Sequence, residues 1–431
     1  MANAHVIRDS LSKPIVCNVY VEDGTIRALE SNPQPSEATD DLIDCSDHVV
    51  IPGLANLHLH SRPARALSDG LPVHVWHRRI DKLSRVMSPE DARVGALVAF
   101  GEMLRGGVTS AIVMTRYFQD AASAAVELGT RAIAVPLAGD TDAVAKGDLD
   151  DLHADLQAVR DHHQRSDRVS LWPGFDSPLT TTREGMRAVA STSAELGLGL
   201  HTHMAESRHE VDTFHERHGK FEGEVLDEEG LIKPGTVLAH CNWLEKEDFE
   251  RFAERQVTVI HNPVSNMRFA SGVCPIGELA EWKIRVALGT DGMLSGYQLN
   301  MFDAMRAAMM LQRISRHDSS ALGVSEVFRM ATENGSSVLK SNSGRIEVGA
   351  AADMAVINMS GLHLQPYRRD PLNDQDLLNL VVWCARPSDV QHVLCDGDVV
   401  VKDWRLTSTP EQVIRNRSNA VDERLRPLIE R

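Results

Sequence analysis

The stretch VVIPGLANLHLH (residues 49–60) joins a run of apolar residues to two histidines that a single leucine separates. Side chains alternate along a β-strand, so His58 and His60 point to the same side. If the strand belongs to a barrel, both imidazoles stand at its carboxyl end, where barrel enzymes hold their active sites. One such pair among 19 histidines is weak evidence alone, and two solvated loop histidines are the alternative.

The first predicted strand is residues 49–58. Seven further apolar runs of strand length follow, separated by longer segments with helical periodicity. These runs are 109–114, 131–137, 169–174, 198–203, 236–240, 257–261 and 284–290. After the first strand, Ser88 is a typical helix cap, Pro89 suits the first helical turn, and Gly106-Gly107 suits the helix end. Eight strand-then-helix units predict an α/β fold, a (β/α)8 TIM-type barrel.

Both ends of the chain predict β-hairpins. PIVCNVYVEDGTIRAL (14–29) turns at Asp23-Gly24, and VQHVLCDGDVVVKDWRL (390–406) turns at Asp396-Gly397. We expect the two ends to pair into one small β-sandwich domain beside the barrel. The predicted divisions are 1–50 (first part of the small β domain), 51–344 (barrel), 345–409 (second part of the small domain) and 410–431 (C-terminal helix).

Composition argues against several classes of protein. The formal net charge is −16, and a surface that acidic repels nucleic-acid phosphates and anionic lipid heads. The six cysteines are scattered, which favours buried reduced thiols over a disulfide framework. We find no signal peptide and no apolar run of the roughly 20 residues that a membrane span needs. We therefore expect a cytoplasmic protein with no nucleic-acid or membrane partner. We also expect a small-molecule substrate and a homo-oligomer of two or more chains.

Histidines recur at the ends of other predicted strands. His201 and His203 close the fifth run, His240 the sixth and His261 the seventh, and Asp291 follows the eighth. A packing role does not explain this placement, because buried histidines occur at any depth in a core. Imidazoles and a carboxylate are ligands that zinc and ferrous iron accept. The sequence therefore predicts a metal site at the carboxyl end of the barrel.

Several of these strand ends carry longer motifs. PGLANLHLH (52–60), HTHMAES (201–207), LAHCNWL (238–244), HNPVSNMRFASG (261–272) and ALGTDG (287–292) resemble the successive strand-end motifs of the amidohydrolase superfamily. They are most similar to its mononuclear aminohydrolase branch, with cytosine, guanine and S-adenosylhomocysteine deaminases and the chlorotriazine and melamine hydrolases. GRIEVGAAADMAVI (344–357) resembles the family's closing β-domain, so the resemblance covers nearly the whole chain.

This resemblance implies a ligand set. The implied metal ligands are His58, His60, His203 and Asp291. His203 is chosen because the family's ligand stands three residues before the catalytic glutamate, here Glu206. The resemblance gives His201 a structural role, and His261 more often orders its loop than touches metal. No lysine ends the fourth strand, where the binuclear branch keeps a bridging lysine, so one divalent metal per chain is implied, with zinc expected and iron(II) as the alternative.

The resemblance also implies the catalytic roles. Asp291 accepts a proton as well as binding metal, His240 orients the attacking water or stabilises developing charge, and Glu206 carries the proton to a ring nitrogen and then to the leaving amine. The implied reaction is hydrolytic deamination of an aminated heterocycle of pyrimidine, purine, pterin or triazine type. The alternatives are removal of an N-alkylamine or halide from a triazine, opening of a cyclic amide and, more distantly, a non-enzymatic scaffold.

The departures from the family pattern concern substrate recognition. In HSRPARALSDGLPVHVWHRRI (60–80), Gly70-Leu71-Pro72 and Trp76 match relatives that act on adenosine-type compounds. The extra basic residues, which either line a pocket or are solvated, are Arg62, Arg65, His74, His77 and Arg78. Asp176 replaces a histidine, and Tyr297 replaces an asparagine. We expect Trp76, Asp176 and Tyr297 to bind substrate, with turn-capping as the alternative for Asp176, and a heterocycle smaller than adenosine.

Overall fold

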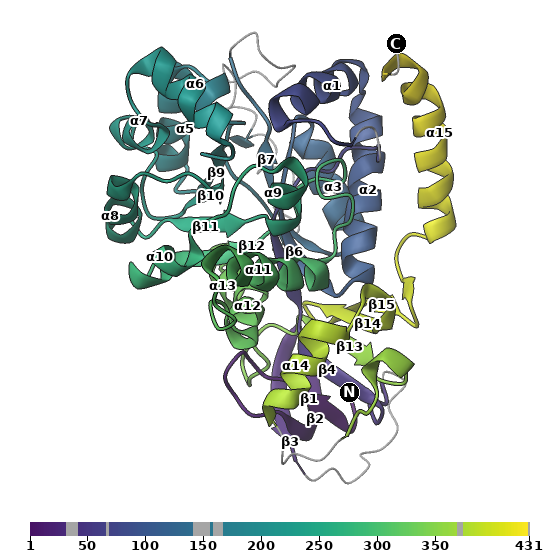
Figure 1. Cartoon of the computed structure of the whole chain (residues 1–431). Helices are drawn as coiled ribbons and strands as arrows, with labels where there is room; N and C mark the ends of the chain where they lie inside the picture. Colours follow the sequence, from purple (N-terminus) through teal and green to yellow (C-terminus); the bar gives the residue numbers. More distant parts are fainter. Residues whose placement is uncertain (32–41, 66–68, 141–155, 158–166, 369–373, 430–431) are drawn as a thin grey trace.

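The structure, a computed structural model, describes residues 1–31, 42–65, 69–140, 156–157, 167–368 and 374–429. A large body holds the central strands, and a smaller β-rich part lies at one end of the molecule with the amino terminus (Figure 1). Residues 66–68 of the basic loop noted above lie outside the described part. No helix in the described part combines the length and apolar character that crossing a membrane requires.

The central strands form two four-stranded parallel sheets in the described part of the chain. The first contains β5 (Leu54–Leu59), β6 (Val108–Thr115), β7 (Arg131–Pro136) and β8 (Val169–Leu171). The second contains β9 (Leu200–Met204), β10 (Thr236–His240), β11 (Thr258–His261) and β12 (Arg285–Leu288). Each of the eight predicted apolar runs overlaps one of these strands, so the alternation of strands and helices is confirmed.

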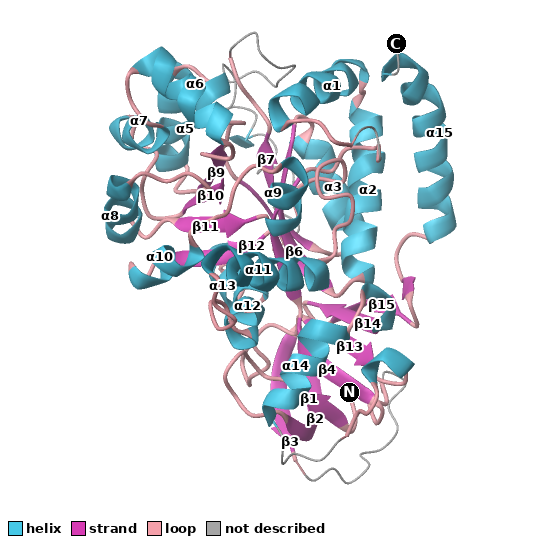
Figure 2. Cartoon of the chain, in the orientation of Figure 1, coloured by secondary structure: helices cyan, strands magenta, loops and turns pink. Residues whose placement is uncertain are grey.

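The two sheets approach each other at both edges. At one seam, Gly174 forms a parallel bridge with His201 of β9. At the other, the backbone N–H of Asp291 donates to the carbonyl of His58 at 3.0 Å. Helices surround the strands (Figure 2). All eight carboxyl ends therefore open toward one region.

A shift of register in β5 aims the two histidines of the first strand. Pairing with β6 is interrupted between Asn56 and Leu59, a bulge of the kind that re-aims side chains beside functional sites. Leu57 packs in a cluster with inward residues of the other central strands, whereas Leu59 packs in the outer core. Beyond this shift, the side chains of His58 and His60 point to the inner side of the strand.

Helices follow most of the central strands, and one more, α14, comes later in the chain, outside the series of central strands. They are α1 (Val73–Val86), α2 (Pro89–Arg105), α3 (Phe118–Leu128), α5 (Arg183–Glu195), α6 (Arg208–His218), α7 (Glu222–Glu228), α8 (Lys246–Glu254), α9 (Pro263–Phe269), α10 (Ile276–Glu281), α11 (Met301–Arg316), α12 (Val324–Ala331), α13 (Glu333–Leu339) and α14 (Asp374–Cys384). Helix α2 begins as predicted: Ser88 and Asp91 bond reciprocally as a capping box. The sequence did not single out α1, which precedes it.

The ends of the chain meet in a second sheet. Its order is β16-β15-β14-β13-β4-β1-β2-β3. The strands are β1 (Ala4–Val6), β2 (Ile15–Glu22), β3 (Thr25–Glu30), β4 (His48–Pro52), β13 (Met354–Asn358), β14 (Val390–Cys395), β15 (Asp398–Lys402) and β16 (Arg405–Leu406). The predicted hairpin turns at Asp23-Gly24 and Asp396-Gly397 both form and touch, since a Cβ on Gly24 would lie 3.0 Å from the Asp396 carbonyl. The predicted pairing of the two ends is confirmed.

The stretch 49–58, which we expected to be one strand, is two. Strand β4 pairs with β1 and β13 in the terminal sheet, and the chain then crosses at Gly53 into β5. A Cβ at Gly53 would lie 2.2 Å from the Thr109 hydroxyl oxygen, so only glycine fits this crossing. Periodicity cannot reveal the division, because both halves are apolar and buried on both faces.

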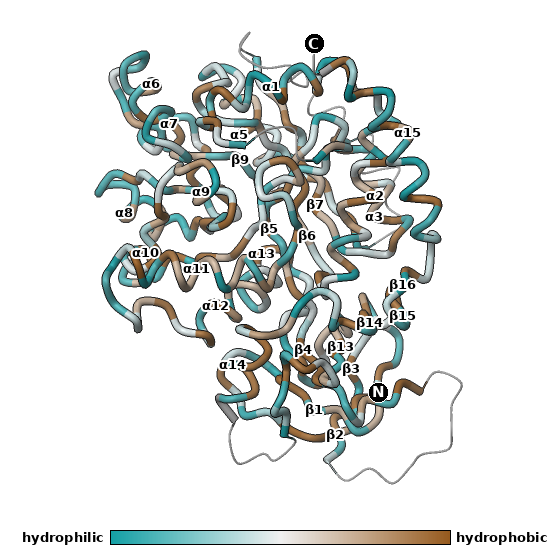
Figure 3. The backbone as a smooth tube through the Cα atoms, turned by 45° about the vertical axis from the view of Figure 1, so that its right-hand side comes forward, coloured by the Kyte–Doolittle hydropathy of each residue, from teal (hydrophilic) through white to brown (hydrophobic). Residues whose placement is uncertain are grey.

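The C-terminal helix α15 (Glu411–Ile429) starts close to the terminal sheet and runs away from it along α2 and α1 (Figure 1). Apolar and polar residues alternate along it (Figure 3). Its Val421 and Leu425 join a cluster with Trp76 and Leu83 of α1. Arg424 also forms an ion pair with Asp91 of α2. Helix α15 thus packs against α1, the helix that follows β5.

Candidate metal centre

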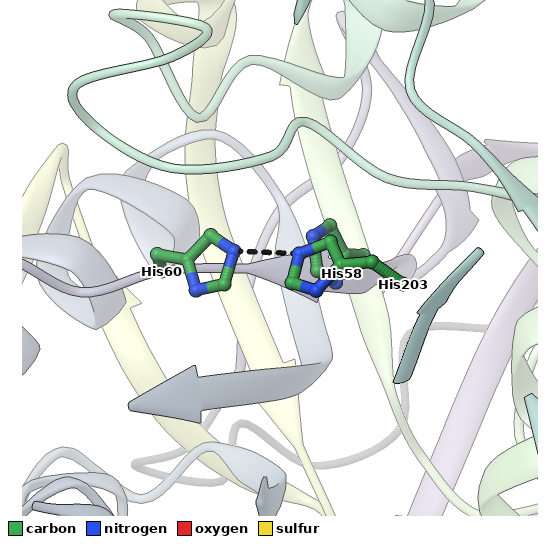
Figure 4. A group of neighbouring side chains, drawn as sticks. All are labelled: His58, His60 and His203. Carbon is green, nitrogen blue, oxygen red and sulfur yellow. Dashed lines mark hydrogen bonds between the residues drawn. The ribbon is translucent and has the colours of Figure 1, made fainter. Parts of the chain in front are cut away.

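His60 and His203 face each other across the open end of the strands (Figure 4). The Nδ1 of His60 lies 2.8 Å from the Met114 carbonyl, and the Nδ1 of His203 lies 2.6 Å from the Asp176 carbonyl. A carbonyl only accepts, so both Nδ1 atoms carry the proton and both neutral rings present a lone pair at Nε2. These two Nε2 atoms are 3.1 Å apart. Neither can donate to the other, so the approach is favourable only with a cation between them.

His58 presents its Nε2 in the same way, through His201. The Nδ1 of His201 donates to the Val237 carbonyl at 2.9 Å, so its Nε2 accepts. The Nδ1 of His58, 2.8 Å from that Nε2, is therefore the donor. Its own Nε2 is fully buried and has no hydrogen-bond partner among the described residues. A native structure rarely leaves such an atom orphaned, and a bound metal satisfies it.

Asp291 completes the set from the end of β12. Its Oδ1 lies 3.8 Å from the Nε2 of His58 and 3.7 Å from that of His60. The other carboxylate oxygen accepts from the Ser265 hydroxyl at 2.6 Å. Burial alone would raise the pKa of Asp291, but the neighbouring His60 and the hydrogen bonds lower it overall. The carboxylate is therefore ionised at neutral pH.

These atoms fit a single divalent metal. The candidate ligand atoms of His58, His60 and His203 lie within 4.8 Å of one another, as do those of His58, His240 and Asp291. Two nitrogens bound tetrahedrally to one zinc ion lie about 3.4 Å apart, close to the separation observed here. Burial lowers the pKa values of His60 and His201 to about 3, which keeps these rings neutral. Three neutral imidazoles and one carboxylate suit zinc, and ferrous iron also accepts them.

His240 and Glu206 are joined by a chain of amides beside this centre. The Nδ1 of His240 lies 2.8 Å from Oδ1 of Asn266, whose amide nitrogen donates to Asn242. The amide nitrogen of Asn242 in turn donates to the backbone carbonyl of Glu206 at 2.8 Å. The chain fixes the direction of His240, which leaves its Nε2 as an acceptor.

Glu206 is held at its backbone by two other glutamates, which the sequence did not reveal. Its N–H donates to Glu210 at 2.9 Å, and the N–H of Ala205 donates to Glu222 at 2.7 Å. Ala205, His240 and Asp291 all have positive φ values, a conformation costly for residues other than glycine and typical of functional sites. Burial, with Asp291 and Asp176 nearby, raises the pKa of Glu206 to about 8.

The other two histidines lie beneath the centre. His201 supports His58, in agreement with the structural role expected of it. His261 is fully buried, and neither of its ring nitrogens has a hydrogen-bond partner among the described residues. Burial lowers the pKa of His261 to about 3, so it is neutral. It belongs to neither group of candidate ligands.

A cavity that is open to solvent reaches the centre. Its floor includes His60, His203, Glu206, His240 and Asp291. Of the three residues expected to bind substrate, Trp76 and Asp176 line it and Tyr297 does not. The Tyr297 hydroxyl instead accepts from Arg268 at 2.8 Å. Asp176 also accepts from the Thr180 hydroxyl at 2.9 Å, so it stabilises a turn while facing the cavity.

Comparison with known proteins agrees with this geometry. Residues 49–400 match the amidohydrolase family. The chain is 34% identical to a 5'-deoxyadenosine deaminase from Methanothermobacter thermautotrophicus, over 94% of this chain and 93% of the relative. It is 33% identical to a 5-methylthioadenosine/S-adenosylhomocysteine deaminase from Haloarcula marismortui, over 91% of this chain and 89% of the relative.

Solved structures show the same architecture. A zinc-bound adenosine deaminase from Xanthomonas campestris superposes with a TM-score of 0.89 at 26% identity, covering 98% of both chains. A zinc-bound atrazine chlorohydrolase from Arthrobacter aurescens has a TM-score of 0.87 at 22% identity, covering 97% of this chain and 99% of the other. The family match spans most of the sequence and includes all four proposed ligands. The chain therefore belongs to the amidohydrolase family, as a hydrolase of carbon–nitrogen bonds that carries one divalent metal.

Proposed function

We propose that this enzyme removes an amino group from a heterocycle by hydrolysis and releases ammonia, with one metal held by His58, His60, His203 and Asp291. The observation that carries the proposal is the convergence of three imidazole lone pairs and a carboxylate at the floor of a cavity. Glu206 lines the same part of the cavity, so a proton-transfer group faces the place where a substrate would meet the metal.

We propose the finer architecture as well. The two parallel sheets close into a (β/α)8 barrel over residues 51–344, because their edges meet at Gly174 with His201 and at His58 with Asp291. Residues 1–50 and 345–409 then form the small β-sandwich, and 410–431 the C-terminal helix. The proposal also keeps the expectations of a cytoplasmic location and a homo-oligomer.

The position and charge of each residue indicate its role in the reaction. When bound, the metal supplies Lewis-acid activation of a water molecule at neutral pH. Asp291, ionised and held by Ser265, accepts a proton from that water. His240 offers its Nε2 to orient the water, because its Nδ1 is committed to Asn266. Glu206, with its raised pKa, retains a proton that it can deliver to a ring nitrogen. The proton that Asp291 took from the water then passes to the departing amine, and the new hydroxyl group returns a proton to Glu206.

The choice of ring is where the relatives and our sequence-based expectation diverge. The curated relatives at 33–34% identity carry names of adenosine-type deaminases, which weighs against our expectation of a smaller ring. Arg62 and Asp176 nevertheless differ from the family pattern described above, and both residues line the cavity. The likeness to the chlorohydrolase, at 22% identity, shows the fold alone and gives no support to halide removal. We propose that Trp76 and Asp176 contact the ring; Tyr297 would reach it only by rearrangement.

The deciding experiment is an ammonia-release screen. Zinc-loaded and iron-loaded protein would be tested on 5'-deoxyadenosine, 5'-methylthioadenosine, adenine, cytosine, guanine, pterin and aminotriazines. Release from at least one class supports the proposal. Chloride or alkylamine release without ammonia would replace it by the triazine alternative, and no release from any compound by fully metal-loaded protein would contradict it.

Glu206→Gln tests the assigned chemistry on whichever compound the screen finds. The amide keeps the shape of the side chain but cannot carry the proton, so we expect kcat to fall by at least ~100-fold, the scale of general acid–base catalysis. Zinc content, measured by elemental analysis, should stay at one per chain. Glu216→Gln, on the exposed face of α6, is the control and should retain full activity.

A further inference from the structure

Arg62 lies in the cavity wall, where the charges of Asp176 and Asp291 act on its guanidinium but no described side chain bonds to it directly. It follows His60 by two residues, is partly buried and lines the cavity. Within the described part of the chain, no hydrogen bond or ion pair engages its guanidinium, which offers five N–H donors. The nearby Arg65, by contrast, pairs with Glu102 and with the carbonyl of Tyr297. Arg78 is exposed and does not line the cavity.

The charge of Arg62 acts close to the metal-binding floor. Arg62 follows His60 by two residues and lines the same cavity as His60, His203 and Asp291. Its guanidinium therefore belongs to the part of the cavity in which the candidate metal ligands meet.

A guanidinium in a partly enclosed site is costly when it loses hydration without gaining a direct acceptor. The charges of Asp176 and Asp291 offset part of this cost, but neither carboxylate is bonded to the guanidinium, so its N–H donors remain available to a ligand. A ligand that brings its own anion removes the cost. Carboxylate is the natural counterpart, since its two oxygens match the planar fork of arginine.

We propose that Arg62 is a specificity residue that binds a carboxylate on the substrate, attached to the heterocycle or directly beside it. This rests on the proposed deamination and deepens it: the preferred substrate is an acidic aminated heterocycle. The carboxylate must be near the ring, because Arg62 is near His60 and the reacting carbon must also reach this floor. If the carboxylate stood at the end of a long flexible substituent, it could not bind Arg62 while the reacting carbon lies at the metal-binding floor.

Matched pairs of ring compounds test the proposal by binding as well as by turnover. The pairs are cytosine with cytosine-5-carboxylate, and pterin with pterin-6-carboxylate. Calorimetry on the zinc-loaded enzyme should show that at least one carboxylate binds about 10-fold or more tightly than its neutral counterpart, the scale of a charge-assisted hydrogen bond. Arg62→Gln should abolish that preference and leave affinity for the neutral ring and zinc content unchanged. Arg62→Lys should restore part of it, and Arg78→Gln should behave as wild type.

The outcomes separate this inference from the proposed function. Equal affinity for both members of every pair, or a preference that survives Arg62→Gln, overturns the role of Arg62 even if neutral rings are deaminated. A carboxylate preference that depends on Arg62 sustains it even if the bound probe is not hydrolysed. Loss of zinc in Arg62→Gln would show that the residue supports the metal centre instead, and would also overturn the proposal.

Discussion

At the scale of single residues, the centre depends on which ring nitrogen of each histidine carries the proton. The backbone carbonyls of Met114, Asp176 and Val237 decide this, directly or through His201. The sequence could identify the histidines, because strand ends and spacing are visible in it. It could not identify the carbonyls, since any residue type supplies one and only the fold brings it to the ring.

His201 provides a test of this arrangement. Because it accepts the Nδ1 proton of His58, His201→Ala should misalign that ligand and weaken zinc binding about 10- to 100-fold, the usual cost of losing a group that orients a ligand. The protein should remain folded and bind one zinc when zinc is in excess. Competition with a chelator measures the affinity. His203→Ala is the comparison, and it should fail to hold stoichiometric zinc at the same concentrations.

Glu222 gives the protein a pH-dependent stability. Burial, with Glu210 next, raises the pKa of Glu222 well above its ordinary value, and its Oε1 has no partner among the described residues. The folded state therefore binds more protons than the unfolded chain above pH 4.5, so stability falls as the pH rises. Burial raises the pKa of Glu210 to about 7, which adds to the loss between about pH 4.5 and 7.

Denaturant unfolding from pH 5 to 8 checks whether stability falls as the pH rises. The wild-type free energy of unfolding should decline with pH, by at most about 1.4 kcal/mol per pH unit for each such group. Glu222→Gln should decline less steeply, and Glu216→Gln should follow the wild type. A wild-type protein that becomes more stable over this range as the pH rises would refute the assignment.

At the scale of elements, the sequence was informative wherever local chemistry decides the structure. The capping box of α2 and the two Asp-Gly hairpins form where they were expected. The division of 49–58 into β4 and β5 was missed, because the neighbours of each half decide it: β13 for one, β6 for the other. Helix α1 was missed for a similar reason, since its partners include Phe269 and the distant α15.

The contact between α15 and α1 should affect substrate binding. Leu425 is 1% exposed and packs in the cluster that holds Trp76. Leu425→Ala should cost about 2–5 kcal/mol of local packing, loosen the α1 wall of the cavity and raise KM more than it lowers kcat. Thermal unfolding and steady-state kinetics measure the two effects. Arg417 is exposed on the same helix, and Arg417→Ala should change neither the stability nor KM. An unchanged KM in Leu425→Ala would show that α15 does not influence the cavity.

At the scale of the whole molecule, the metal centre links the two parallel sheets. His58 and His60 come from the first sheet and His203 from the second, while Asp291 follows the last strand. Without a cation, lone pairs and a carboxylate face one another at the junction of the sheets. We therefore expect metal occupancy to stabilise the whole fold and not the site alone.

Removal of metal tests that expectation. Dialysis against a chelator should lower Tm, and adding one equivalent of zinc should restore it. A ligand present at about 1,000 times its Kd contributes about 4 kcal/mol to stability, so the shift should amount to several degrees. The variant Glu206→Gln should show the same shift, since it keeps the ligands. An identical Tm with and without zinc would contradict the expectation that metal binding stabilises the whole fold.

The position of β4 between β1 and β13 also matters while the chain is being synthesised. Proteins emerge from the ribosome amino terminus first, so β1, β4 and every metal ligand appear before Met354–Asn358 of β13. Until then one edge of β4 lacks its partner, and an open strand edge invites pairing with other polypeptides. A nascent chain can thus contain the whole metal centre while still exposing an aggregation-prone edge, which makes the interval between synthesis of β4 and synthesis of β13 the vulnerable phase of this enzyme's biogenesis.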